Sequence, residues 1–240
     1  MTYVMSDIHG NGRRFESIMK QINIQPEDTL YILGDVIDRY PDGIRILRRI
    51  MKMPNVKMLL GNHEYMMLEA LEEYEELQTE EQNSHDRKGQ RSPKLYQWYR
   101  NGGEVTHRYL QHIRKELRKE ICDYLHKLPL NLDVEVNGIK YKLIHASPME
   151  YYQQMISHYS SQKEFCVWKR WKPYHGVPEG ITLIFGHTPT CYFHEDESLK
   201  IWYGGNAIGI DCGCGYPDGR LACLRLEDCK EYYSEEERDI

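Results

Sequence analysis

The 240-residue sequence lacks any hydrophobic run of the roughly 20 residues that a membrane-spanning helix needs. Its first residues also lack a basic region followed by a long apolar core, so we expect no secretory signal peptide. It contains no internal repeat, no low-complexity segment and no G-x-x-x-x-G-K-[ST] phosphate-binding loop, which excludes the ordinary P-loop NTPases. We therefore expect one cytoplasmic domain over residues 1–240 that does not bind a membrane.

The sequence also lacks an excess of positive charge and a cysteine pattern typical of disulfides or zinc sites. The chain has 31 Lys and Arg against 37 Asp and Glu, and this net charge of -6 argues against general nucleic-acid binding. The seven cysteines are odd in number and scattered, so we expect reduced thiols rather than a disulfide framework. The Cys212-Gly213-Cys214 spacing is shorter than the C-x₂-C of zinc sites and no second pair follows, which favours structural packing.

Polar side chains follow five short apolar runs, at the points where we expect buried strands to end. Any one of these motifs is a weak signal, because Asn62 could equally cap a helix and a His after a single strand is usually a satisfied core residue. Ligands of open α/β sheets bind at the carboxyl ends of the strands, so five such ends predict one shared site. The polar residues at these ends are Asp7, His9, Asp35, Asp38, Arg39, Asn62, His63, Glu64, His145 and His187.

The remaining segments are predicted from periodicity and turn residues. The segment around residues 78–104, which has no apolar periodicity between Gln78 and Lys94, is expected to form an exposed cap or loop insertion that shapes substrate access. Helical spacing resumes over 105–128, and Asn137-Gly138 predicts a hairpin between two strands. We expect four short C-terminal strands near 191–193, 200–203, 207–211 and 220–226 to extend a second sheet, followed by a frayed acidic tail over 231–239.

The collected donors include Asp7, His9, Asp35, Asn62, His145 and His187, which offer oxygen and nitrogen ligands. This set is too large for a single structural zinc ion and suits two divalent ions about 3.5–4 Å apart that share a carboxylate. Manganese fits best and iron or zinc are alternatives, whereas magnesium alone fits poorly because it prefers oxygen and few protein ligands.

The motifs SDIHG, GDVIDR, GNHE, HAS and GHT occur in this order along nearly the whole chain. In this they resemble the metallophosphoesterase superfamily, most closely its phosphoprotein phosphatase branch, which includes bacterial serine/threonine phosphatases and symmetrical diadenosine tetraphosphatases. The resemblance implies an α/β fold of two packed mixed β-sheets flanked by helices, a four-layer α-β-β-α sandwich. It places Asp7, His9 and Asp35 on one metal, and Asp35, Asn62, His145 and His187 on the other.

The same resemblance assigns the remaining roles. It implies that His63 is the proton donor, that Asp38 is its orienting carboxylate and that Arg39 binds phosphate. It also implies that Asn62 contacts the substrate. The stretch Val167–Arg170 resembles the W-x-R segment of bacterial members, which makes Arg170 a second phosphate clamp. Ser6, Tyr40 and Ser147 depart from the family pattern without removing a ligand, and they put the substrate class in doubt.

The leading functional hypothesis is hydrolysis of phosphomonoesters, above all phosphoserine and phosphothreonine on proteins, by water that the two ions activate for in-line attack. The alternative is a dinucleoside polyphosphate hydrolase, whose product would be a nucleoside diphosphate instead of free phosphate. A non-catalytic scaffold is the third possibility. The intact set of six ligands, together with Asp38 and His63, argues against a scaffold.

Overall fold

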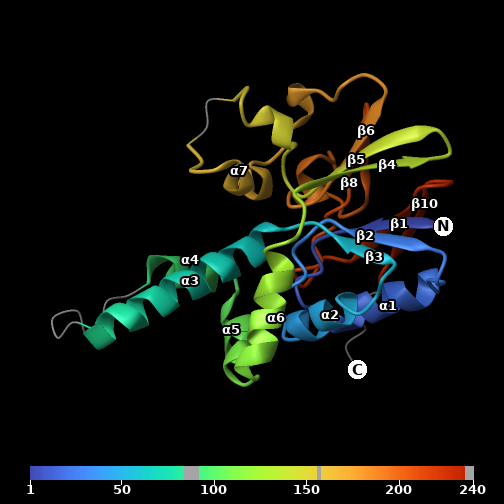
Figure 1. Ribbon diagram of the computed structural model, residues 1–240. Coiled ribbons are helices and arrows are strands. Elements are labelled where there is room, and N and C mark those ends of the chain that lie inside the picture. The colour runs from blue at the N-terminus through green and yellow to red at the C-terminus, as the bar shows by residue number, and fades with distance from the viewer. Residues whose placement is uncertain (84–91, 156–157, 236–240) are drawn as a thin grey trace.

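The structure, a computed structural model, describes residues 1–83, 92–155 and 158–235 and is built around two mixed β-sheets of five strands each (Figure 1). The first sheet has the order β10-β9-β1-β2-β3 and the second has the order β4-β5-β6-β8-β7. The strands are β1 (Thr2–Met5), β2 (Thr29–Ile32), β3 (Val56–Met58), β4 (Asn131–Val136), β5 (Ile139–Ile144), β6 (Ile181–Phe185), β7 (Trp202–Gly204), β8 (Ala207–Gly209), β9 (Ala222–Arg225) and β10 (Lys230–Tyr233).

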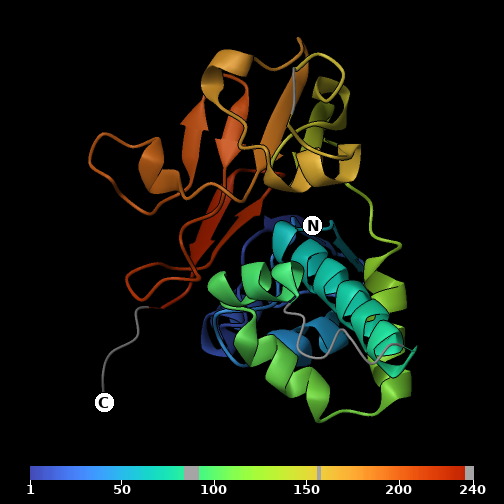
Figure 2. The ribbon, with the colours of Figure 1, turned by 90° about the vertical axis from the view of Figure 1, so that its left-hand side faces the viewer.

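Helices cover the outer faces of both sheets. Figure 1 shows α1 and α2 beneath the first sheet and α3 extending away from the sheets alongside α4. Helix α7 lies to the left of the second sheet in Figure 1, on the side that faces the viewer in Figure 2. The α-helices of the described residues are α1 (Gly12–Ile22), α2 (Gly43–Ile50), α3 (Asn62–Asn83), α4 (Pro93–Arg100), α5 (Glu104–Gln111), α6 (Lys115–Leu125) and α7 (Gln162–Trp168). Short 3₁₀ turns lie at Met149–Tyr151, Pro173–His175 and Thr190–Tyr192.

The two-residue period of the strands sorts their side chains into separate cores. In β1, Tyr3 and Met5 pack beneath the first sheet with Phe15 of α1, whereas Val4 points between the sheets. Leu143 of β5 packs with Val4 in that middle layer. A third cluster lies on the far face of the second sheet and includes residues of α7. These layers confirm the predicted α-β-β-α arrangement.

Strand direction brings the predicted motifs to one edge. The strands β1, β2 and β3 are mutually parallel, as are β5, β6 and β8. Their carboxyl ends therefore meet where the two sheets face each other, and the turns that follow these strands carry the polar residues. The Asn137-Gly138 hairpin is also confirmed, since β4 and β5 pair antiparallel across it.

The C-terminal part of the chain differs from the prediction. The segment around Cys191 forms a 3₁₀ turn rather than a strand. The last predicted strand, β9, does not extend the second sheet but pairs antiparallel with β1 in the first. The tail that we expected to be frayed instead begins with β10, which pairs with β9. Tyr232 of β10 is buried, and its ring centre lies 6.2 Å from that of Tyr3, so this part of the tail packs onto the first sheet. Residues 236–240 lie outside the described residues.

The helical region before the hairpin also differs. The periodicity over 105–128 belongs to two helices, because the chain turns after Gln111 and restarts at Lys115. The Arg118 side chain donates to the Leu110 carbonyl at 3.0 Å, which satisfies the exposed end of α5. Of the segment predicted as an exposed cap, 78–83 complete α3 and Pro93–Arg100 form α4, while 84–91 lie outside the described residues.

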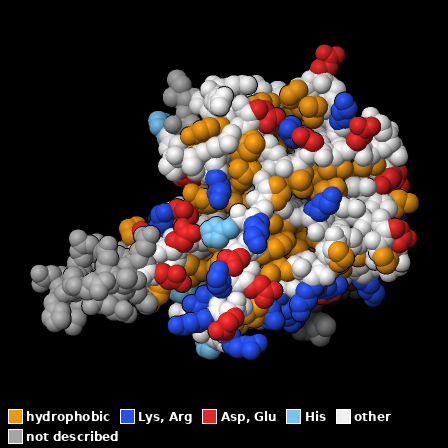
Figure 3. Space-filling view, viewed as in Figure 1, with side chains coloured by type: hydrophobic (Ala, Val, Ile, Leu, Met, Phe, Trp, Pro, Cys, Tyr) orange, Lys and Arg blue, Asp and Glu red, His pale blue; other side chains and the backbone are white. Residues whose placement is uncertain are grey.

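Surface charge is unevenly distributed. Figure 3 shows Lys and Arg side chains gathered along the lower edge of the molecule, the edge at which Figure 1 places α2. Helix α2 carries Arg45, Arg48 and Arg49. Two of these pair with acidic neighbours, Arg45 with Asp42 at 3.1 Å and Arg49 with Glu16 at 2.6 Å. In the part of the chain that the structure describes, no helix combines the length and apolar character needed to cross a membrane.

Candidate metal centre

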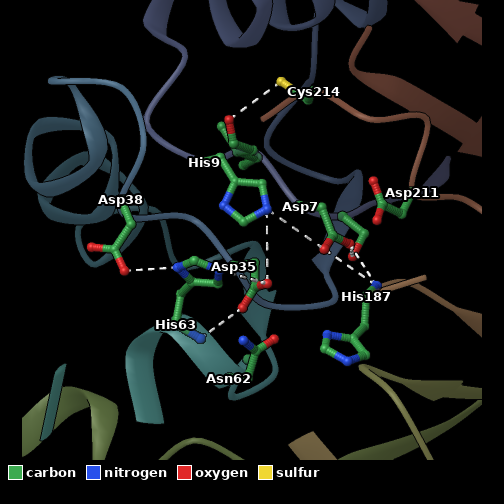
Figure 4. A network of polar contacts seen from close by, with 12 residues as sticks. Asp7, His9, Asp35, Asp38, Asn62, His63, His187, Asp211 and Cys214 are labelled. Atoms are coloured by element: carbon green, nitrogen blue, oxygen red, sulfur yellow. Dashed lines mark hydrogen bonds and ion pairs between the residues drawn. The ribbon is translucent and has the colours of Figure 1, made fainter. Parts of the chain in front are cut away.

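All six predicted metal ligands lie together at the junction of the two sheets, and Asp35 is at their centre (Figure 4). One Asp35 carboxylate oxygen lies 3.9 Å from Nε2 of His9 and 3.9 Å from Nε2 of His63. The other lies 3.5 Å from Nε2 of His145. Two groups of three potential ligand atoms result, His9-Asp35-His63 and Asp35-His145-His187, each within 4.8 Å. Asp35 belongs to both groups.

Asn62 and His145 bring an oxygen and a ring nitrogen close together. The Nδ1 atom of His145 lies 2.7 Å from the Leu33 carbonyl oxygen, which can only accept, so Nδ1 carries a proton. The other ring nitrogen, Nε2, lies 3.0 Å from Oδ1 of Asn62. A cation between these atoms would satisfy both, so this pair of side chains fits a metal ligand set.

Buried carboxylates make the site electrostatically suited to cations. Burial and the neighbouring Asp35 raise the pKa of Asp7. Burial by itself raises the pKa of Asp35 as well, but the imidazoles of His145 and His63 outweigh it and hold that pKa below its ordinary value. Asp7 accepts hydrogen bonds from the Ser6 hydroxyl and the His187 backbone N–H, which orient it. Such adjacent buried negative charges require a positive counter-charge.

His63 forms a second unit with Asp38. Its Nδ1 atom lies 2.7 Å from Oδ2 of Asp38, and the indole N–H of Trp98 donates to the same oxygen at 2.8 Å. The Asp38 backbone N–H donates to the Thr106 hydroxyl at 3.1 Å. Burial lowers the pKa of His63, but the carboxylates of Asp35 and Asp38 outweigh this and raise it. The raised pKa favours the protonated imidazole, the form that has a proton to donate.

Backbone strain is concentrated in the same turns. Positive φ values are uncommon for residues other than glycine, and they cluster where surrounding structure enforces them. Six of the predicted site residues have them, namely Asp7 (55°), His9 (49°), Asp35 (53°), Asp38 (72°), Arg39 (66°) and His187 (61°).

Arg39 and Arg170 both line a polar pocket of about 140 Å³ above the ligand cluster. The Arg39 guanidinium lies 4.7 Å from the centre of the Tyr216 ring, and that of Arg170 lies 6.0 Å from the centre of the Tyr192 ring. The other lining residues are Asp7, His9, Asp35, Asn62, His63, Asn101, Trp168, His187, Pro189, Asp211 and Tyr216.

A family model for calcineurin-like phosphoesterases matches residues 2–205. The chain belongs to this family. The predicted resemblance to the metallophosphoesterases is therefore confirmed. The ligand clusters fit the divalent ions that this fold implies.

Relatives of this metallophosphoesterase carry several activities. A region of 69 residues, 28% of this chain, is 38% identical to the symmetrical bis(5'-nucleosyl)-tetraphosphatase of Erwinia tasmaniensis. The matched region spans only 25% of that relative's length. A protein serine/threonine phosphatase from Saccharomyces cerevisiae superimposes with a TM-score of 0.57 at 12% identity, covering 100% of this chain and 81% of that one. A cold-active protein-tyrosine phosphatase from a Shewanella species superimposes with a TM-score of 0.57 at 15% identity, covering 98% of this chain and 80% of that one. The two structural matches show a shared fold.

Sequence reasoning missed several residues of the phosphoesterase site. Asp211 is buried, lines the pocket and follows β8 at its carboxyl end, so the strand-end argument that found the other ligands could have found it. Burial and the neighbouring Asp7 raise the pKa of Asp211. Trp98 lies on α4, inside the segment predicted to be an exposed cap, yet it is fully buried against Asp38. The two residues lie 60 positions apart, so no local pattern indicated this contact.

Glu64 has a different place from its neighbours in the GNHE motif. Its carboxylate is fully buried outside the pocket and accepts backbone N–H groups from Asp35, Val36, Ile37 and Gly61 at 2.8 to 3.3 Å. A side chain at Gly61 would collide with Asp35, since an added Cβ would lie 2.2 Å from its Oδ1 atom. Glu64 thus ties the Asp35 turn to the start of α3.

The cysteines are free thiols, as predicted. Cys212 and Cys214 are both buried and make separate contacts: the Thr190 hydroxyl approaches Sγ of Cys212 at 3.8 Å, and Cys214 donates to the Ile8 carbonyl at 3.3 Å. Burial raises the pKa of both thiols, which disfavours metal-binding thiolates.

Proposed function

We propose that the chain hydrolyses phosphomonoesters with two divalent metal ions, and that phosphoserine and phosphothreonine on proteins are its substrates. The observation that carries this proposal is the position of Asp35 in both groups of potential ligands. Asp35 would be shared by the two ions. Asp7 and His9 would complete one ligand set, and the other would consist of Asn62, His145 and His187. We propose manganese as the ion, with iron or zinc as alternatives.

Bound divalent ions supply a water nucleophile near neutral pH and neutralise charge on the phosphoryl oxygens. Arg39 and Arg170 line the same pocket and would bind the remaining phosphoryl oxygens. His63, with Asp38 on its Nδ1 atom, would present its Nε2 proton to the departing oxygen. The pocket volume of about 140 Å³ suits a single phosphoryl group, so the leaving group would extend outward. An extended phosphopeptide is compatible with this arrangement.

A dinucleoside polyphosphate is the second candidate substrate. The sequence match to a symmetrical bis(5'-nucleosyl)-tetraphosphatase favours it. In addition, Tyr192 and Tyr216 are exposed beside the two pocket arginines, and exposed aromatic rings can stack on nucleobases. This reaction would cleave an anhydride and release nucleoside diphosphates.

Product identity separates the two candidates. Purified protein with manganese is incubated with phosphopeptides, diadenosine tetraphosphate and small phosphoesters, and the products are identified by mass spectrometry. Free phosphate from the phosphopeptides supports our proposal, whereas ADP released at a higher kcat/KM supports the second candidate. The Asp35→Asn variant is the control for a contaminating phosphatase. Equal activity in that variant would contradict both assignments.

A further inference from the structure

Arg14 makes a set of contacts that its sequence context did not indicate. It lies in the first turn of α1 and is 4% exposed. Its guanidinium donates to the backbone carbonyls of Cys214 and Tyr216 at 2.8 Å each and to that of Pro217 at 2.7 Å. The side-chain oxygen of Asn11 accepts the Arg14 backbone N–H at 3.1 Å, which fixes the base of the side chain. Arg14 therefore holds one loop by three carbonyls.

This loop, residues 212–220, contributes Tyr216 to the lining of the pocket. It is closed by hydrogen bonds from Tyr216 N to Gly213 O at 2.9 Å and from Arg220 N to Cys212 O at 2.9 Å. Gly215 lies so close to the site that an added Cβ would be 2.5 Å from Nη1 of Arg39. A shift of this backbone by one ångström would therefore displace or release the Arg39 side chain.

Tyr216 connects the loop to Arg39. Its half-exposed ring lies 4.7 Å from the Arg39 guanidinium carbon, within the range of a cation–π contact. Both side chains line the pocket. The direction of the Arg39 guanidinium thus depends on the ring, the ring depends on the loop, and the loop depends on Arg14.

We propose that Arg14 is a positioning residue for phosphate binding, which holds the 212–220 loop so that the Tyr216 ring supports Arg39. This inference rests on the proposed role of Arg39. A guanidinium suits the task because its planar donors reach several carbonyls at once, whereas a lysine ammonium is a single point of donation on a flexible stem. The Arg14→Lys variant keeps the positive charge but loses the planar set of donors that reaches the three carbonyls.

The test measures phosphate binding as well as turnover. In Arg14→Lys we expect the KM for a phosphomonoester and the calorimetric Kd for inorganic phosphate to rise together by about three- to tenfold, the size of a cation–π contact. Metal content, measured by mass spectrometry, should not change. Arg13→Lys is the matched control, since Arg13 is its exposed neighbour on the same turn, and both constants should remain at the wild-type value.

A double-mutant cycle with Arg39→Ala decides whether the effect passes through Arg39. We expect Arg14→Lys to have no further effect on phosphate binding once Arg39 is absent, whereas equal effects in both backgrounds would overturn the inference. If Arg14→Lys does not fold, Tyr216→Ala takes its place in the cycle, and unchanged phosphate binding there would also overturn it. A wild-type protein that neither binds nor releases phosphate would instead refute the proposed function, and this inference with it.

Discussion

Replacing Glu64 with Gln should destabilise the fold and loosen the turn that carries Asp35. Oε1 of Glu64 accepts the N–H groups of Val36 at 2.8 Å and Ile37 at 3.3 Å. Oε2 accepts those of Asp35 at 2.9 Å and Gly61 at 3.2 Å. The carboxylate is fully buried, so water cannot replace either oxygen.

The magnitude follows from these four bonds. A Gln side chain has nearly the same shape, but one of its two terminal atoms is an amide nitrogen, which donates. Whichever way the amide turns, two backbone N–H groups lose their acceptor. Each unsatisfied buried group costs about 1–3 kcal/mol, so the free energy of unfolding should fall by about 2–6 kcal/mol. This is a large part of the roughly 5–15 kcal/mol of a typical domain.

Urea denaturation followed by circular dichroism measures this loss. Glu72→Gln is the matched control, because Glu72 lies on the same helix, is 56% exposed and pairs with His126 at 3.3 Å. The control should lose less than about 1 kcal/mol, as exposed pairs do. If Glu64→Gln lost no more than the control, the Asp35 turn would not depend on the Glu64 carboxylate and the reasoning would fail.

Four further predictions concern the metals and the pocket. A chelator should abolish phosphatase activity and manganese should restore it best, whereas full activity in metal-free buffer would refute the two-metal proposal. Asp35→Asn should lower the amount of bound metal, measured by mass spectrometry, more than Asp7→Asn does, because we propose that Asp35 contacts both ions. Two tightly bound ions in the Asp35→Asn variant would exclude that shared role for Asp35. His63→Asn should slow phosphoserine peptides by about 10²–10⁴-fold but p-nitrophenyl phosphate far less, since p-nitrophenolate leaves without a proton, and equal losses would exclude proton donation. Arg170→Ala, like Arg39→Ala, should raise KM and lower kcat together, and wild-type kinetics would remove Arg170 from the site.

The clustering of the candidate metal ligands could be predicted from the sequence because each follows an apolar strand directly. A buried strand that ends in Asp, Asn or His is a local pattern, and parallel strands necessarily bring their carboxyl ends together. The resemblance that these motifs carry implied the two sheets, and the Asn137-Gly138 turn residues predicted the hairpin. The strand-end reasoning could have extended to Asp211, which follows β8 in the same way.

Contacts across the fold could not be predicted in this way. Trp98 reaches Asp38, 60 positions away in the sequence, and its burial depends on where α4 packs against α3. The pairing of β9 with β1 likewise depends on which sheet edge remains open after the other strands have paired.

The sequence by itself determined the strand ends, the metal-binding residue types and the family, because these depend on residues close together in the chain. Only the tertiary structure decided what each polar group contacts. Glu64 accepts N–H groups 27 to 29 positions away, and Arg14 holds carbonyls 200 to 203 positions away. The physical reason is that a buried hydrogen bond forms with whichever partner the packed elements bring within about 3 Å, and sequence spacing carries no record of that distance.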